Sequence, residues 1–350
     1  MTFPAEEIKK IAVFRALQLG DMLCAIPAIR ALRNAYPAAE ITLLGLPWAK
    51  SLLPRFPAYF DAFMHFPGFP GLPEQKFHPE SFAVFLYQML GNKFDLIIQM
   101  QGNGTIVNLI VELFGAKHTA GFFLENDYCP DKKNYLEYPN RYHEIERHLQ
   151  LMEYLGIDSC GTQLEFPLYD TDYEQLEKNG LALNAKQYVC IHPGSRGVYR
   201  QWPPEYFAAL ADYCAEQNLQ VVLTGTNDEL SIIEEVVRHM EYEPVIAAGK
   251  TTIGAAAALI QNAFALISNC TGVSHIAAAL KTPSIVISMD GEPERWGPMN
   301  NQLHHTIDWT KTPEFSIVFN ELKKLFLHGP EGDHLRNDAI SASEDILQRS

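Results

Sequence analysis

The sequence predicts an α/β protein made of two doubly wound parallel sheets. Short apolar runs, each followed by a segment with helical periodicity, recur along both halves of the chain. This alternation is typical of parallel strands that are covered by helices. The length of 350 residues suits two domains, at roughly 100–200 residues for each domain. We expect the polar stretch 169–185 to be the linker between them.

The first domain, residues 1–168, contains five apolar runs that we interpret as strands: Ile11–Arg15, Ile41–Gly45, Ala62–Phe66, Leu96–Gln99 and Thr119–Phe122. An amphipathic helix is expected over His143–Leu155. The segment Phe66–Pro79 is too rich in proline and glycine for a regular element, so we predict a long loop there.

The second domain, residues 186–310, repeats the pattern. Its expected strands are Tyr188–Ile191, Gln220–Thr224, Val245–Ala247, Leu266–Ser268 and Ser284–Ile287, and its expected helices are Pro204–Glu216, Glu229–Met240, Ile253–Asn262 and Val273–Leu280. Ligands of such sheets bind outside the carboxyl ends of the strands. We therefore expect the site in strand-to-helix loops that face a central cleft.

The composition limits the partners and the location of the protein. Lys and Arg total 27 against 42 Asp and Glu, which gives a net charge of −15 and argues against a nucleic-acid binder. The first sixty residues are more basic and can receive an anion. The start of the sequence has no secretory pattern, and no run of eighteen apolar residues occurs. We expect a cytoplasmic protein, with peripheral contact at the inner membrane surface as a further possibility.

The first loop, Arg15–Pro27, leads from a strand into a helix. Gly20 permits a tight turn, and Asp21 falls at the start of the helix. The Asp21 carboxylate can serve as a general base, or it can simply cap the helix N-terminus. The local pattern alone favours the cap.

The loop Ile191–Pro204 carries features of a phosphate site. Gly194 and Ser195 allow close approach of the backbone to a phosphate, and Arg196 and Arg200 can supply cations. The alternative is an ordinary strand-to-helix connection with exposed arginines.

The loop Ser268–His275 is the third candidate. The amides of Thr271, Gly272 and Val273, together with the helix dipole, suit a diphosphate. Alternatively, Thr271 or Ser274 caps this helix. A nucleophilic pair of Cys270 and His275 is disfavoured because no third group orients it.

Two weaker signals come from acidic residues. Glu229 follows a strand at a place where a carboxylate can accept hydrogen bonds from ribose hydroxyls. Asp170 and Asp172 match an acid-x-acid pattern that can hold a divalent ion, but capping of a helix is the favoured interpretation.

Five motifs together carry a family resemblance: LGDMLCAIPAIRALR at Leu19–Arg33, FDLIIQMQGN at Phe94–Asn103, IHPGSRGVYRQWP at Ile191–Pro203, AAGKTTIGAAAALI at Ala247–Ile260 and SNCTGVSHIAAALKTPSIVI at Ser268–Ile287. The first and the last are the most specific. In order and spacing they resemble glycosyltransferase family 9, the ADP-heptose:lipopolysaccharide heptosyltransferases, over residues 8–310. The resemblance implies the GT-B fold, with two Rossmann-like domains.

The resemblance also implies roles for residues. Asp21 matches the acid that deprotonates the acceptor hydroxyl, and Arg200 stands where a lysine usually lies near the donor diphosphate. The implied donor-binding residues are Gly194, Ser195, Arg196, Glu229, Gly249, Lys250, Thr251, Cys270, Thr271, Gly272 and Val273. Those implied for acceptor binding are Gln18, Gly20, Gln101 and Asn103. In this fold the C-terminal helices often return to the first domain, so the tail 311–350 is expected to do so through Phe315–Leu327.

The function implied is inverting, metal-independent transfer of a sugar, heptose from ADP-heptose, to a lipopolysaccharide-core or similar anionic glycan, with no cofactor. One departure matters: Cys270 stands where the family usually has an aspartate, and a thiol cannot accept the same hydrogen bonds from sugar hydroxyls. Two alternatives therefore stay open. One is a non-catalytic or altered-donor protein that binds sugar nucleotides, and the other is an epimerase or hydrolase of the same fold.

Overall fold

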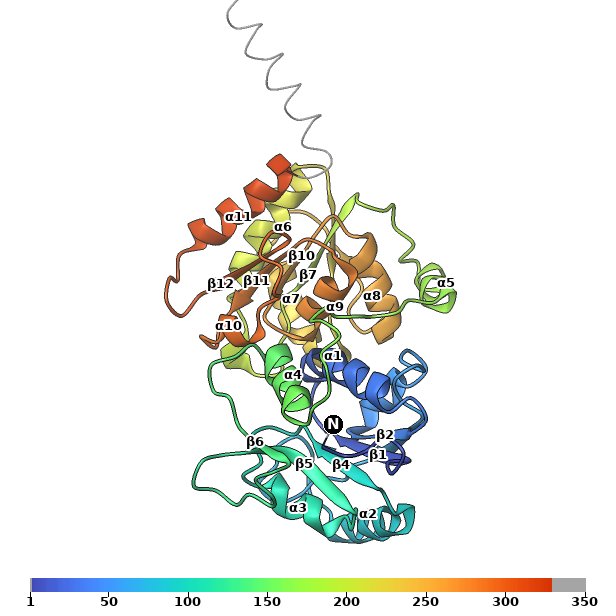
Figure 1. The fold of residues 1–350 in the computed structure, drawn as a ribbon. Helices are drawn as coiled ribbons and strands as arrows, with labels where there is room; N and C mark the ends of the chain where they lie inside the picture. Colours follow the sequence, from blue (N-terminus) through green and yellow to red (C-terminus); the bar gives the residue numbers. More distant parts are fainter. Residues whose placement is uncertain (1, 329–350) are drawn as a thin grey trace, which may run out of the picture. The chain divides into compact units, whose positions relative to one another are not determined.

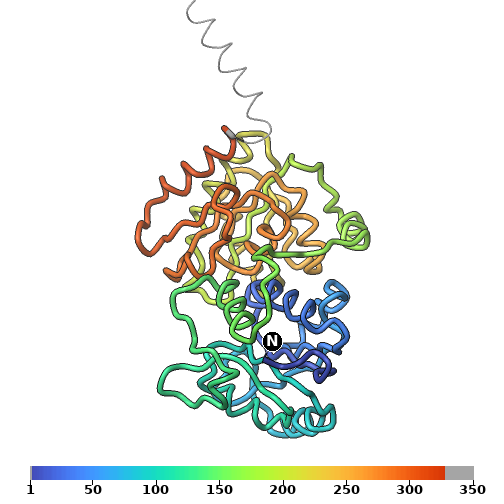
Figure 2. The backbone as a smooth tube through the Cα atoms, in the orientation of Figure 1, coloured from blue at the N-terminus to red at the C-terminus, as the bar shows by residue number. Residues whose placement is uncertain are grey.

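The computed structural model describes residues 2–328, which divide into two compact units (Figure 1). Unit 1 is the chain up to Leu168 together with the segment Glu294–Trp296. Unit 2 is Tyr169–Pro293 together with residues 297–328. In Figure 2 the backbone of unit 1 runs from blue to green and that of unit 2 from green to red, apart from the short segment 294–296.

Unit 1 is built on a six-stranded parallel sheet in the order β3-β2-β1-β4-β5-β6. The strands are β1 (Lys10–Phe14), β2 (Glu40–Gly45), β3 (Ala62–His65), β4 (Leu96–Gln99), β5 (His118–Phe123) and β6 (Tyr135–Glu137). The central strands β1, β2 and β4 are buried on both faces, as expected for parallel strands with helices on both sides.

The helices of unit 1 are α1 (Leu19–Ala35), η1 (Pro47–Leu52), α2 (Pro79–Asn92), α3 (Val107–Leu113) and α4 (Glu144–Tyr154). In Figure 1, α1 and α4 lie on one face of the sheet and α2 and α3 on the other. On the second face the Phe14 ring lies 4.7 Å from that of Phe66 and 5.8 Å from that of Phe114, centre to centre. This aromatic packing anchors β1, whose carboxyl end leads into the first loop. The segment 66–78 is a loop, as predicted.

Unit 2 repeats the design with the order β12-β11-β10-β7-β8-β9, again all parallel. Its strands are β7 (Tyr188–His192), β8 (Gln220–Leu223), β9 (Val245–Ile246), β10 (Leu266–Asn269), β11 (Ser284–Ser288) and β12 (His304–Asp308). Its helices are α5 (Asp170–Lys178), η2 (Val198–Arg200), α6 (Pro204–Glu216), η3 (Asn227–Glu229), α7 (Leu230–His239), α8 (Ile253–Asn262), α9 (Gly272–Leu280) and α11 (Phe315–His328). The short helix α10 (Pro293–Trp296) begins at the last residue of this part of unit 2, and its other three residues belong to unit 1. Two six-stranded all-parallel sheets confirm the predicted fold class.

Three features differ from the sequence-based expectation. The strands β6 and β12 were not expected, because β6 is only three residues long and β12 is rich in polar residues. The stretch 169–185 contains α5, which packs against α8 in unit 2. The helix α11 belongs to unit 2, where Val318, Leu322 and Phe326 enter the same core as α6, so the expected return of Phe315–Leu327 to the first domain is wrong. The rest of the expected tail, 329–350, lies outside the described residues.

The physical reason for the position of α11 is its apolar face. Val318 and Leu322 are fully buried, and the Phe326 ring stacks 5.0 Å from that of Phe264. Burial of such side chains stabilises a helix by roughly 1.5–3 kcal/mol for each residue. Within residues 2–328, no helix combines the length and the apolar character needed to cross a bilayer.

Candidate active site

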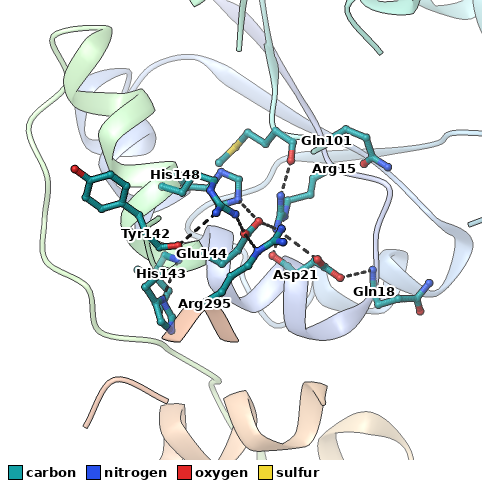
Figure 3. Close-up of polar contacts among 12 residues, drawn as sticks. Arg15, Gln18, Asp21, Gln101, Tyr142, His143, Glu144, His148 and Arg295 are labelled. Carbon is teal, nitrogen blue, oxygen red and sulfur yellow. Dashed lines mark hydrogen bonds and ion pairs between the residues drawn. The ribbon is translucent and has the colours of Figure 1, made fainter. Parts of the chain in front are cut away.

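Asp21 lies in the first turn of α1, at the carboxyl end of β1. Its Oδ2 accepts a hydrogen bond of 3.2 Å from the backbone N–H of Gln18, which precedes the helix (Figure 3). The carboxylate therefore does cap α1, as the local pattern favoured. The cap uses one oxygen, while Oδ1 lies 3.9 Å from Nη2 of Arg15. The side chain is one quarter exposed, so a ligand can still reach it.

Arg15 is the buried cation beside Asp21. It is the residue directly after β1 and has no exposed surface. Its Nε donates to the backbone oxygen of Asp21 at 2.7 Å, Nη1 donates to the backbone oxygen of Met100, and Nη2 donates to Oε1 of Glu144 at 3.1 Å. These contacts tie the loops after β1 and β4 to the start of α4. Arg15 is thus fixed in place beneath the Asp21 carboxylate.

Glu144, the first residue of α4, contacts three arginines and one histidine. It pairs with Arg15 and Arg147, its Oε1 lies 3.3 Å from Nε2 of His148, and its Oε2 lies 3.2 Å from Nε of Arg295. Burial alone would raise the pKa of this carboxyl, but the hydrogen bond of His148 and the surrounding positive charges outweigh burial and lower it. Glu144 is therefore ionised at neutral pH.

Burial and the neighbouring charges also shift the pKa values of Asp21 and His148. Burial, and then the charge of Glu144, raise the pKa of Asp21, against the opposing charge of Arg15. Burial and the charge of Arg15 lower the pKa of His148 to about 4, so this ring is neutral at pH 7. A carboxylate with a raised pKa is a stronger base than an ordinary one. Asp21 is accordingly suited to accept a proton.

Of the residues expected to bind an acceptor, Gln18, Gln101 and Asn103 lie in the loops after β1 and β4, and Gly20 lies in the first turn of α1. Oε1 of Gln101 accepts from the backbone N–H of Ala16 at 2.6 Å, so this side chain positions the first loop. Oδ1 of Asn103 accepts from the backbone N–H of Thr105 at 3.1 Å, which closes a local turn. Gly20 has helical rather than left-handed backbone angles, and α1 already begins at Leu19. The expectation of a tight turn at Gly20 is therefore wrong.

In unit 2, the end of β10 is joined to the loop after β7 by Asn269. Its Oδ1 accepts from the backbone N–H of Trp202 at 2.9 Å, and its Nδ2 donates to the backbone oxygens of Pro193 and Gly194 at 2.7 and 3.3 Å. Asn269 is fully buried. It holds the segment of Gly194 and Ser195 against the strand that leads to α9.

The N-terminus of α9 carries the candidate diphosphate amides. Thr271 precedes the helix but makes no side-chain cap, and its buried Oγ1 has no hydrogen-bond partner among the described residues. The hydroxyl of Ser274 donates to the backbone oxygen of Thr271 at 2.7 Å, so it does not cap the first amides either. The capping alternative for this helix is wrong. The amides of Gly272 and Val273 remain at the positive end of the helix dipole.

Arg200 and Cys270 lie at the same edge of this sheet. Arg200 is partly exposed and forms an ion pair with Asp290, which follows β11. Burial, and then the charge of Asp290, raise the pKa of the Cys270 thiol to about 12, against the opposing charge of Arg200. The thiol is therefore protonated at neutral pH, which agrees with the rejection of cysteine catalysis. His275 is buried in α9.

Glu229 lies against the loop that contains Gly194. Its Oε2 accepts from the backbone N–H and the hydroxyl of Thr226 at 2.8 and 2.9 Å, and its Oε1 lies 3.8 Å from Nε2 of His192. A Cβ at position 194 would lie 2.2 Å from Oε1 of Glu229, so a larger residue there would force the Glu229 side chain to move. The structure thus brings together two residues that are far apart in sequence.

The remaining predicted residues occupy separate positions. Gly249 has a φ of +71° and, with Lys250 and Thr251, forms the turn between β9 and α8. Arg196 is exposed and Ser195 is buried. Oδ2 of Asp172 accepts from the backbone N–H of Tyr169 at 3.0 Å and so caps α5, as favoured. Among the described residues, no group of three or more His, Cys, Asp or Glu side chains could hold a metal ion.

Sequence reasoning missed five residues: Arg15, Glu144, Arg295, Asn269 and Asp290. The buried Asn269 directly after an apolar run was a signal, because a buried amide must find partners. Glu144 and Arg295 are 151 residues apart, and no local pattern could pair them.

Comparison with known proteins places the chain among glycosyltransferases. The family model described as "Glycosyltransferase family 9 (heptosyltransferase)" matches residues 84–324. Lipopolysaccharide heptosyltransferase 3 of Escherichia coli K12 is 27% identical over 339 residues, which is 94% of this chain and 95% of that protein. The structure of E. coli ADP-heptose lps heptosyltransferase II aligns with a TM-score of 0.70 at 19% identity, over 91% of this chain and 99% of that one. The structure of an E. coli heptosyltransferase solved with ADP aligns with a TM-score of 0.66 at 16% identity, over 90% of this chain and 99% of that one.

Proposed function

The chain belongs to glycosyltransferase family 9, the heptosyltransferases, and from this premise we propose that it transfers heptose from ADP-heptose to a lipopolysaccharide-core glycan, with inversion and without a metal ion. The names of the relatives support the donor and the acceptor class, because they include lipopolysaccharide heptosyltransferases, an ADP-heptose enzyme and an enzyme solved with ADP. The acceptor is then an anionic glycolipid or glycan, met at a membrane surface.

Unit 2 supplies the donor side of this proposal. The amides of Gly272 and Val273 at the start of α9, together with the guanidinium of Arg200, suit the two phosphates of ADP. Glu229 can accept from ribose hydroxyls beside the Gly194 backbone, and the turn at Gly249–Thr251 would lie beside the adenine. Support for this arrangement comes from the positions of these residues, all in loops that follow strands of one sheet.

Unit 1 supplies the base. In the proposed reaction, the Asp21 carboxylate takes the proton of an acceptor hydroxyl. The acceptor oxygen forms a bond to the anomeric carbon while the bond from that carbon to the diphosphate oxygen breaks. ADP leaves with the electron pair of that bond, and Arg200 and the α9 amides stabilise its charge.

The observation that carries the proposal is the state of Asp21: one oxygen is committed to Gln18, and the pKa is raised by burial. The decisive variant is Asp21→Asn, assayed by ADP release with a lipopolysaccharide-core acceptor. We expect transfer to fall by about 100-fold or more, with ADP binding retained.

Asp172→Asn is the matched control. Asp172 occupies the same place in α5, where its carboxylate accepts the backbone N–H of Tyr169 at 3.0 Å. Both variants lose a comparable cap, so the control accounts for the effect of the lost cap on α1. Transfer by Asp21→Asn at the rate of the control would exclude Asp21 as the base.

Cys270 supports a second candidate, a protein that binds sugar nucleotides without transferring the sugar or that uses another donor. A protonated thiol is a poor acceptor for sugar hydroxyls. ADP-heptose binding without turnover across several acceptors would favour this candidate. Turnover of the donor in the absence of any acceptor would instead favour an epimerase or hydrolase.

A further inference from the structure

The ion pair of Arg200 and Asp290 joins two loops that are not adjacent in the sheet. Arg200 ends η2 in the loop after β7, and Asp290 is the second residue after β11. In the sheet order, β10 lies between these two strands. The pair therefore reaches across the carboxyl end of β10, where Cys270 and the first amides of α9 lie. Both charges influence the Cys270 thiol, which agrees with this placement.

The Asp290 carboxylate does not depend on Arg200 for its position. Its Oδ1 accepts from the hydroxyl of Ser288 at 2.8 Å and from the backbone N–H of Glu292 at 3.3 Å, while Oδ2 pairs with Arg200. The Asp290 side chain is 14% exposed and that of Arg200 is 32% exposed. Arg200 can thus turn to another anion, and Asp290 would keep its place.

A carboxylate beside a diphosphate site needs an explanation, because like charges repel and weaken binding of the anion. What it can supply is a strong acceptor for hydroxyl groups, which the neighbouring thiol of Cys270 cannot replace. A bare nucleotide offers no hydroxyl beyond its β-phosphate, whereas a sugar nucleotide offers several.

We propose that Asp290 is a specificity-determining residue of the donor site, which favours the sugar nucleotide over the free nucleoside diphosphate. Its carboxylate accepts hydrogen bonds from hydroxyls of the transferred sugar when Arg200 turns to the diphosphate. After transfer the sugar is gone, so Asp290 repels ADP and competes with it for Arg200, which promotes release. This inference rests on the proposed use of ADP-heptose by the same loops.

The test is calorimetric titration of ADP and of ADP-heptose into the full-length wild type and Asp290→Asn. We expect Asp290→Asn to bind ADP as tightly as the wild type or up to about tenfold more tightly, and to bind ADP-heptose about tenfold more weakly. The ratio of the two dissociation constants is the readout, because damage to the fold would weaken the binding of both ligands and would leave the ratio unchanged.

Asp308→Asn is the matched control, since Asp308 ends the neighbouring strand β12 and pairs with Lys311 at 3.1 Å. It should leave the ratio unchanged. Asp290→Ser, which also removes the charge, serves as a second variant if the asparagine variant does not fold. If the Asp290 variants lower the affinities for ADP and ADP-heptose by the same factor, or change neither affinity, Asp290 has no role in discriminating between the two ligands. Wild-type protein that binds neither ligand would instead overturn the proposed function.

Discussion

Arg15 holds its buried Nη2 3.9 Å from Oδ1 of Asp21, close enough to influence the carboxylate but too far for a hydrogen bond. That nitrogen donates instead to Glu144 at 3.1 Å. Burial raises the pKa of Asp21 more than the charge of Arg15 lowers it, and the charge of Glu144 adds to the rise. This arrangement lets a partly buried aspartate stay basic beside an arginine.

The pH dependence of transfer should report this balance. A raised pKa means that Asp21 becomes protonated, and loses its function as a base, at a higher pH than an ordinary aspartate. The acid limb of kcat/KM is therefore expected above the ordinary value of 3.8. The same shift means that the stability contributed by Asp21 is fully present below 3.8 and is lost as pH rises through its raised pKa.

Arg295→Met should move that acid limb to higher pH. Burial is the main cause of the raised pKa of Asp21, and the charge of Arg295 opposes it, so removal of this charge raises the pKa further. Arg238→Met, which removes an exposed arginine paired with Glu235, is the control and should leave the limb in place. A shift of the limb to lower pH in Arg295→Met would contradict the assigned electrostatics.

Glu144→Gln should have the opposite effect on Asp21 and a larger effect on stability. Loss of its negative charge lowers the pKa of Asp21, so the acid limb moves to lower pH. Arg15 and Arg147, both buried, also lose their shared partner, and the free energy of unfolding should fall by about 3–5 kcal/mol. Urea denaturation measures this change. The control is Glu146→Gln in the same turn of α4. Its free energy of unfolding is expected to lie within about 0.5 kcal/mol of that of the wild type.

Local pattern predicted the fold well, because the strands are apolar runs buried by helices on both sides. It also located the loops that carry the candidate site, since parallel strands bring their carboxyl ends to one edge. It failed where polar residues enter a strand, as in β12, and where an apolar helix had two possible surfaces to cover. In unit 2, α11 packs in part through the stacking of Phe326 on Phe264, and periodicity does not describe such a fit.

The partners of the candidate residues were less accessible to sequence reasoning. Asp21 was identified by its position, but its protonation depends first on burial and then on the charges of Arg15 and Glu144, whose contact spans 129 residues. Likewise, Arg200 was identified as a cation without its partner Asp290, 90 residues away. Long-range pairing of charges leaves no periodic signal in one sequence.

Gly194→Ala should disturb the proposed ribose site. The new Cβ would lie 2.2 Å from Oε1 of Glu229, so the carboxylate must move, at a cost of about 1–3 kcal/mol. We expect ADP affinity to fall by about tenfold if the displaced Glu229 loses a ribose hydrogen bond. Gly225→Ala is the control, because its Cβ would meet Glu229 only at an ordinary 3.4 Å. Equal ADP affinities in the two variants would remove Glu229 from the site.

Asn269→Ala should weaken both the fold of unit 2 and its affinity for ADP. The side chain satisfies the backbone N–H of Trp202 and the backbone oxygens of Pro193 and Gly194. Each buried group left without a partner costs about 1–3 kcal/mol, and the loop of Gly194 and Ser195 loses its anchor on β10. Thermal unfolding and titration with ADP measure the two effects. Asn300→Ala, which removes an amide from an exposed turn, should change neither, and an Asn269 variant as stable as this control would show that β10 does not anchor the loop.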